Sequence, residues 1–83
     1  MKIKSMATGE WGKIKALFTI TTEDGFSIDG FKIVERYDGD KFMSLPSRQD
    51  KEGEWQNTIY IESKEKKEEL EKMALTYYKN EIL

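Results

Sequence analysis

The chain has 83 residues, which is enough for one small domain, and residues 1–83 are treated as a single domain. Charged residues make up 36% of it but the net charge is only −2, which argues against a strongly basic nucleic-acid binder, so any basic surface must be local. The absence of cysteine and histidine excludes disulfides, thiol chemistry and the usual zinc sites. A domain this small has a marginally stable core when neither disulfides nor a bound metal support it, so we expect a homodimer.

The hydropathy pattern gives no sign of a membrane protein. No apolar run approaches the length of a membrane span, and the N-terminal stretch MKIKSMATGEW lacks the apolar core of a signal peptide. We therefore expect a cytoplasmic protein with no membrane partner.

The first two strands are predicted at residues 2–6 and 13–22, with a turn at residues 8–12 between them. The second strand alternates apolar and polar residues, which is typical of a strand with one buried face. That face is expected to consist of Ile14, Ala16, Phe18 and Ile20. If Ile3 and Ser5 join it, the lysines of both strands lie on the opposite face.

The third strand, residues 26–36, changes its apolar phase between Ile28 and Phe31. We expect a β-bulge at Asp29-Gly30, since glycine accepts the unusual dihedrals of a bulge. Asp38-Gly39 predicts a hairpin leading to a fourth strand, residues 41–45, which ends at the single proline. A polar loop and a fifth extended segment, residues 55–61, follow.

The last quarter of the chain predicts a helix of roughly 19 residues, about 28 Å long. Ser63 is the expected N-cap. Helical spacing groups the side chains of Leu70, Met73, Ala74 and Tyr77, with Glu81 one turn further on. The predicted fold is α+β: an antiparallel β-meander of four to five strands followed by a C-terminal α-helix, dimeric.

Lysines are the first candidates for binding. In the register above they share the face opposite the core, and like charges set side by side destabilise a sheet. A phosphate backbone would offset that cost. The alternative is a solvated sheet face on which lysines prevent aggregation, and the residues alone favour it. The candidates are Lys2, Lys4, Lys13, Lys15 and Lys32.

Arg48, in the loop after the proline, has a planar fork of donors that suits phosphate, although a plain surface loop is the alternative. Aromatic side chains could stack on bases, but such residues more often pack in a core or an interface. They are Trp11, Tyr37, Trp55, Tyr60, Tyr77 and Tyr78. No carboxylate pair stands in a catalytic context and there is no glycine-rich phosphate loop, so we expect no enzyme, metal, cofactor or small-molecule substrate.

The stretch FMSLPSRQDKEGEW resembles the stage V sporulation protein G family, the septation regulators of bacteria. That family has an apolar strand end, then Pro-Ser-Arg or Pro-Ser-Lys, then a polar turn with Gly-Glu-aromatic. The matching residues are Phe42, Met43, Leu45, Pro46, Ser47, Arg48, Gly53, Glu54 and Trp55. Upstream, GKIKALFTITTEDGFSIDGFKIVE resembles the family's second and third strands, and downstream Leu70, Leu75 and Tyr78 fit its helix.

The resemblance covers about residues 2–78, with two departures. The family's Ala-His-Pro-Ile segment is NTIYIE here, and many members continue past the helix with a charged tail, whereas this sequence ends at Leu83. A function that rests on that tail is not carried over.

The resemblance implies a homodimeric, non-enzymatic protein that binds DNA, and in some members RNA, and affects sporulation, septation or gene expression. The resemblance favours the hypothesis that the lysines bind nucleic acid, and it makes Arg48 the residue of the loop to test for binding. The alternative is an adaptor of the division or sporulation machinery that contacts another protein through a sheet edge and aromatics, without binding nucleic acid. The clustered lysines favour the first hypothesis, and the net charge of −2 favours the second.

Overall fold

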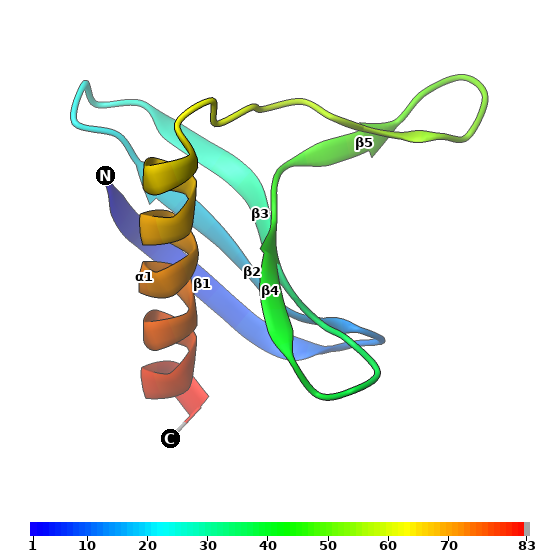
Figure 1. Cartoon of the computed structure of the whole chain (residues 1–83), viewed down its shortest axis with the longest axis horizontal. Coiled ribbons are helices and arrows are strands. Elements are labelled where there is room, and N and C mark those ends of the chain that lie inside the picture. Colours follow the sequence, from blue (N-terminus) through cyan, green and yellow to red (C-terminus); the bar gives the residue numbers. More distant parts are fainter. Residues whose placement is uncertain (83) are drawn as a thin grey trace.

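A computed structural model describes residues 1–82 as a sheet, a helix and a projecting arm (Figure 1). The four-stranded antiparallel sheet has the order β1-β2-β3-β4. Its strands are β1 (Lys2–Trp11), β2 (Ile14–Thr21), β3 (Ser27–Glu35) and β4 (Lys41–Ser44). The arm is a second, two-stranded sheet made of β5 (Ser47–Gln49) and β6 (Trp55–Asn57), and α1 (Lys64–Ile82) follows it. The predicted α+β class, the meander and the C-terminal helix are confirmed.

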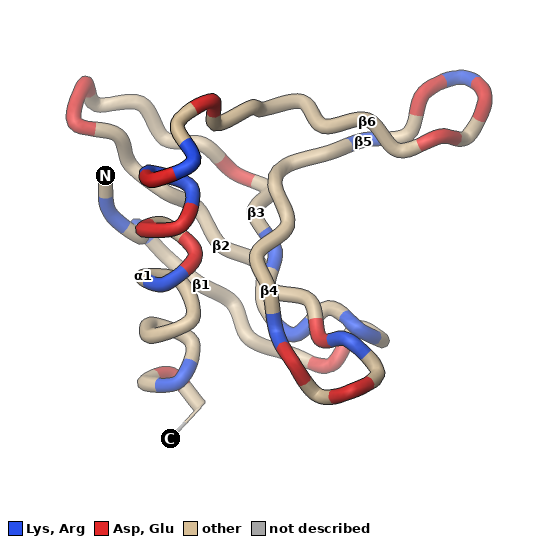
Figure 2. The backbone as a smooth tube through the Cα atoms, in the orientation of Figure 1, with Lys and Arg blue, Asp and Glu red and all other residues tan. Residues whose placement is uncertain are grey.

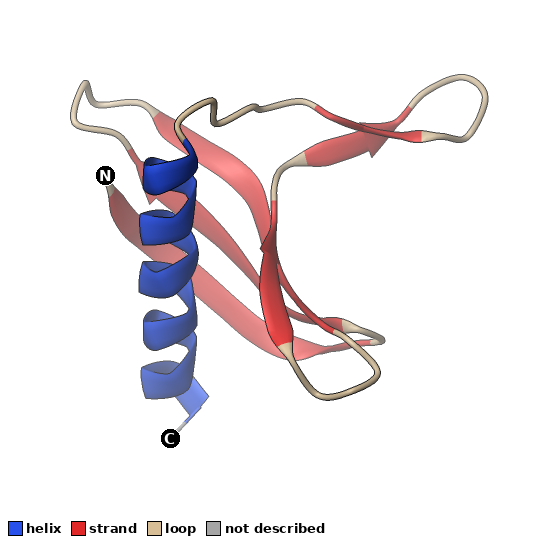
Figure 3. Ribbon diagram, viewed as in Figure 1, coloured by secondary structure: helices blue, strands red, loops and turns tan. Residues whose placement is uncertain are grey.

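The core lies between one face of the sheet and α1, which crosses in front of it (Figure 3). Phe18 and Phe31 form its centre, with stacked rings whose centroids are 5.3 Å apart. The strands contribute Ala16, Phe18, Ile20, Phe31, Ile33 and Met43 to this core, Leu45 follows β4, and the helix contributes Leu70, Ala74 and Tyr78. Ala16, Phe18 and Ile20 therefore share the buried face, as predicted.

The first hairpin differs from the prediction in length and register. β1 continues to Trp11, and the turn consists of Gly12 and Lys13, with Gly12 at a φ of 65°. A register shift between Ile3 and Ser5 places Ser5 opposite Thr19, outside the core, and brings the next residue opposite Phe18 instead. The prediction was right for Ile3 and wrong for Ser5, because one extra residue in a strand moves the later side chains to the other face.

A second shift changes the start of β2. Ile14 lies opposite Val34 whereas Ala16 lies opposite Ile33, so Lys15 is the extra residue of a bulge. Ile14 is therefore on the face that carries Val34 and not on the core face, and its predicted place in the core was wrong. Simple alternation could not reveal this, since a bulge leaves the hydropathy pattern intact while it reverses the orientation.

The bulge predicted at Asp29-Gly30 is confirmed. The register of β2 against β3 shifts between Phe18 and Ile20, and Gly30 has a φ of 98°. The hairpin at Asp38-Gly39 is confirmed as well, since the backbone N–H of Arg36 donates to the carbonyl of Asp40 at 2.7 Å.

The arm takes the place of the predicted polar loop. Ser47 pairs with Asn57 and Gln49 with Trp55, so the residues after Pro46 form a hairpin. Asp50 closes it, because its Oδ1 accepts the backbone N–H groups of Glu52 and Glu54, each at 2.9 Å. The extended segment predicted at 55–61 is a strand only at Trp55–Asn57.

The helix begins as predicted, with the Oγ of Ser63 accepting the backbone N–H of Lys66 at 3.2 Å. Its buried positions are Leu70, Ala74 and Tyr78, spaced four residues apart. Met73 and Tyr77 are half-buried beside this stripe and Glu81 is exposed, so the buried tyrosine is Tyr78 and not its predicted neighbour. Within residues 1–82, no helix is long and apolar enough to cross a membrane.

Candidate nucleic-acid interface

The sheet face turned away from α1 is the candidate surface, and we call it the open face. Residues directly opposite each other in antiparallel strands share a face, so the register defines its members. One row across the four strands is Ala7, Leu17, Lys32 and Ser44, and the next is Trp11, Ile14, Val34 and Phe42. Towards the other end of β1 the members are Ser5 with Thr19, and Lys2 with Thr21 and Ser27.

Cations are spread along the open face. Lys2 lies opposite Thr21, and Lys4 reaches Ser27, whose Oγ is 3.4 Å from its Nζ. Lys32 lies in the central row, and the guanidinium of Arg36 stacks 4.6 Å from the ring centroid of Phe42. Arg36 was not predicted from the sequence. It could have been, because residues two apart in a strand share a face and Arg36 is two residues beyond Val34.

These four cations form no ion pair among residues 1–82. Across residues 1–82, all ion pairs between side chains involve Lys15 or Lys41, and none involves Lys2, Lys4, Lys32 or Arg36. Two nearby carboxylates have other partners: Oδ1 of Asp29 accepts the hydroxyl of Thr19 at 2.7 Å, and Glu23, in the turn after Thr21, lies 3.7 Å from the amino group of Met1. The open face thus carries a local positive charge in a chain whose net charge is −2. Along α1 the two signs are interspersed (Figure 2).

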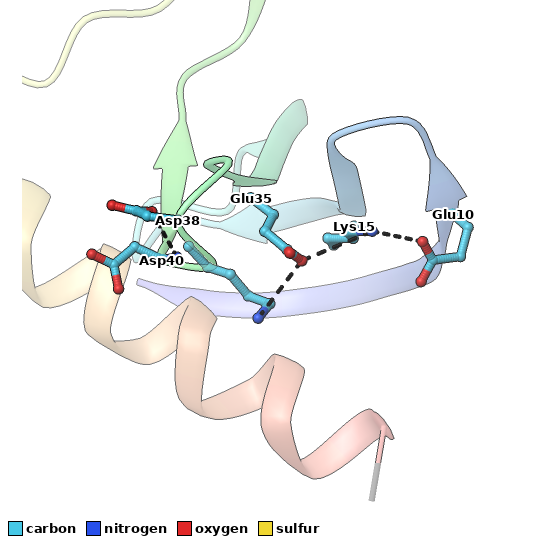
Figure 4. A network of polar contacts seen from close by, with 6 residues as sticks. Glu10, Lys15, Glu35, Asp38 and Asp40 are labelled. Carbon is cyan, nitrogen blue, oxygen red and sulfur yellow. Dashed lines mark hydrogen bonds and ion pairs between the residues drawn. The ribbon is translucent and has the colours of Figure 1, made fainter.

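Lys15 does not belong to the open face, which corrects the prediction that the five lysines share one face. Its Nζ lies 2.6 Å from Oε2 of Glu10 and 3.8 Å from Oε2 of Glu35, which also pairs with Lys41 at 3.9 Å (Figure 4). The hydrogen bond that the Lys15 ammonium donates to Glu10 raises the pKa of Lys15 above its usual value, and burial opposes this rise only in part. The bulge at this residue turns it towards Glu35 and away from the other lysines.

Lys13 and Arg48 occupy separate places. Lys13 is exposed in the β1–β2 turn, where its carbonyl accepts the backbone N–H of Glu35 at 2.8 Å. Arg48 lies opposite Gln56 on the arm, and since strand side chains alternate, it points to the other side of the arm from Trp55. The structure therefore places Lys2, Lys4 and Lys32 on one sheet face, whereas Lys13, Lys15 and Arg48 lie elsewhere.

Two tryptophans border the open face. Trp55 is 65% exposed, and the Nζ of Lys32 lies 5.8 Å from the centroid of its ring. Trp11 is 48% exposed and lies over Gly9, where an added Cβ would come within 2.7 Å of its ring. Among the other aromatic candidates, Tyr37 is exposed between β3 and β4, Tyr60 is exposed between β6 and α1, Tyr77 is half-buried on α1, and Tyr78 is in the core.

The fold and this surface define a class of protein: a small α+β domain with one sheet face covered by a helix and the other open, basic and aromatic. The chain belongs to the SpoVG family, whose model matches residues 1–80. The resemblance seen in the sequence is thereby confirmed.

Curated relatives support the same assignment. The chain is 34% identical over 71 residues to "Putative septation protein SpoVG" of Agathobacter rectalis, an alignment that covers 86% of this chain and 80% of the relative. A protein of the same name from Clostridium perfringens is 31% identical, with 81% of this chain and 73% of the relative covered. The Heliobacterium modesticaldum protein is 30% identical, with 86% and 79% covered. No solved structure matches the chain.

Proposed function

We propose that the protein is a non-enzymatic, cytoplasmic regulator that binds nucleic acid as a homodimer and affects sporulation, septation or gene expression. The names of its relatives support the link to septation. The observation that carries the binding proposal is the set of unpaired cations on the open face: Lys2, Lys4, Lys32 and Arg36.

Phosphate is the ligand that suits these cations. Lysine and arginine bind a phosphate backbone without regard to base sequence, and each contact releases counterions from the nucleic acid. The proposed binding is therefore sensitive to salt and modestly selective. Both DNA and RNA carry this backbone, so the proposed binding extends to either.

The free edge of β1 supports the dimer. This strand of ten residues lies at one edge of the sheet, and unpaired backbone groups on a long edge invite another strand. The opposite edge is partly covered, since the carboxylate of Glu71 on α1 accepts the backbone N–H of Met43 at 3.0 Å. Sedimentation equilibrium at micromolar concentration tests the dimer, and a monomer mass would contradict it.

A salt-titrated binding assay tests the nucleic-acid proposal. The parent, Lys4→Gln and Lys32→Gln are compared on unrelated duplex and single-stranded oligonucleotides. Both variants should weaken binding to every sequence and flatten the plot of log affinity against log salt, by about 0.9 per lost phosphate contact on duplex. Lys72→Gln, an exposed lysine of α1, is the matched control. Unchanged affinity and slope in both variants would refute the proposal.

Protein-protein adaptor is the second candidate, and a specific observation favours it. Trp11 and Leu17 are 48% and 39% exposed on the open face, next to the free edge of β1. Exposed apolar side chains beside an open edge are also features of protein interfaces. If the parent binds no oligonucleotide even at low salt, this function replaces the first.

A further inference from the structure

We propose that the open face binds single-stranded nucleic acid, with bases stacked on Trp55 and Trp11 and with Lys32 and Arg36 meeting the phosphates. This inference rests on the proposed function and specifies the strand state of the ligand.

Trp55 is placed at the open face by the arm. It pairs with Gln49 in the β5–β6 hairpin, and its ring is approached by Lys32 from β3. Since the residue is 65% exposed, most of the indole is left available to a ligand. A base stacked there would find the ammonium of Lys32 beside it, in position for the adjoining phosphate.

Trp11 offers a second surface for stacking, and its ring is held by packing against the strand backbone. Its ring lies over Gly9 of the same strand, within a distance that no Cβ could share. The missing side chain lets one face of the indole lie against the backbone, so the other face is turned outward. A ring held in this way loses little conformational freedom when a base stacks on it.

The surface between the two platforms is suited to a chain of nucleotides. β1 and β3 are two strand spacings apart, which is about 10 Å. The half-exposed Leu17 lies between them on β2, and Arg36 lies on Phe42 beyond Val34. Aromatic platforms interleaved with cations are the pattern by which proteins hold single strands, because every base has a face that can stack.

The positive charge of the open face favours a polyanion over an apolar protein surface as its ligand. An apolar protein surface would have to bury Lys32 and Arg36 without compensation, which is costly. A polyanion supplies the opposite charge, and single strands also supply exposed bases. In a duplex the bases are already stacked on one another, so they cannot use Trp11 and Trp55.

The test compares a fluorescein-labelled oligodeoxythymidine with the duplex that it forms with oligodeoxyadenosine, by fluorescence anisotropy. Trp55→Ala and Trp11→Ala should each weaken single-strand binding by about 5- to 150-fold, the range for loss of one stacked base, and should change duplex binding less than about twofold. Trp55→Phe should recover most of the affinity. Tyr60→Ala is the matched control, because Tyr60 is 71% exposed and lies between β6 and α1, outside the strands that form the open face.

The outcomes separate this inference from the proposed function. If the parent binds neither ligand, the proposed function fails. If binding depends on Lys32 but not on either tryptophan, the proposed function stands and the stacking inference is overturned. If Trp55→Ala lowers the sedimentation mass without changing oligonucleotide affinity, the open face is covered by a second copy of the chain, and the inference is likewise overturned.

Discussion

Gly30 faces Pro46: a Cβ added at Gly30 would lie 3.3 Å from the Cβ of Pro46, tighter than ordinary van der Waals contact. The bulge of β3 and the proline that precedes the arm are thus parts of one packing arrangement. Pro46 is buried although it begins a segment whose other residues are largely exposed.

Gly30→Ala should destabilise the fold more than Gly25→Ala. Both glycines have positive φ, at 98° and 92°, so alanine is strained at either position by about 1–2 kcal/mol. Only Gly30 has a neighbour close enough for the added methyl group to collide with, whereas a Cβ at Gly25 meets nothing within 4 Å. Urea unfolding of the two variants measures the difference, and equal losses would show that Pro46 gives way without cost.

Glu71→Ala should cost about 1–3 kcal/mol of unfolding free energy, because it leaves the backbone N–H of Met43 without its acceptor. Met43 is only 5% exposed, so water reaches this group poorly. Glu69→Ala, in an exposed position of the same helix, is the control. Thermal or urea unfolding measures the loss of stability. If Glu71→Ala loses no more unfolding free energy than Glu69→Ala, water has replaced the carboxylate as the acceptor.

Lys15→Gln should leave oligonucleotide affinity within about twofold of the parent, since Lys15 is occupied by Glu10 and Glu35 rather than exposed on the open face. Lys32→Gln measured alongside gives the contrast. Equal weakening by the two variants would place Lys15 in the binding surface after all.

The same ion pair predicts a change of stability at alkaline pH. The pKa of Lys15 is raised above 10.5 by the hydrogen bond to Glu10 and by the neighbouring carboxylates. Its contribution is therefore fully present below pH 10.5 and is lost as the pH rises through the higher folded-state pKa. The stability advantage of the parent over Lys15→Gln should shrink across that interval in urea titrations at successive pH values.

Asp50→Ala should open the arm without unfolding the sheet. The backbone N–H groups of Glu54 and Glu52 hold the pKa of Asp50 below 3.8, so its contribution is present above pH 3.8 and is lost as the pH falls through the lower folded value. Amide hydrogen exchange should accelerate at Glu52 and Glu54 in the variant while Phe18 stays protected. Acceleration throughout β2 would mean that the arm and the sheet unfold together.

Much of the fold could be predicted from the sequence because its signals are local. The β3 bulge is visible as a change of apolar phase at a glycine, and the N-cap and the Asp38-Gly39 hairpin are visible from residue type. The bulge at Lys15 was not visible, because neither a glycine nor a change in hydropathy marks it. The arm was missed because Ser47–Gln49 is short and polar, and its pairing with Trp55–Asn57 depends on tertiary geometry.

The candidate site was predicted in part for the same reason. Lys2, Lys4 and Lys32 follow from alternation and lie on the open face, whereas the placement of Lys15 depended on the bulge at that residue. Arg36 and the approach of Trp55 to Lys32 needed the structure, since the latter joins two separate sheets.

The strand order has a consequence for how the chain folds. Each strand of the main sheet pairs with its neighbour in sequence, so the sheet can assemble through short loop closures. Helix α1 contacts both edge strands, β1 and β4, and its docking on β1 joins the two ends of the chain, which requires the largest loop to close. We expect the helix to dock after the transition state. Ala74→Gly, in its buried stripe, should then speed unfolding far more than it slows refolding in stopped-flow chevron measurements.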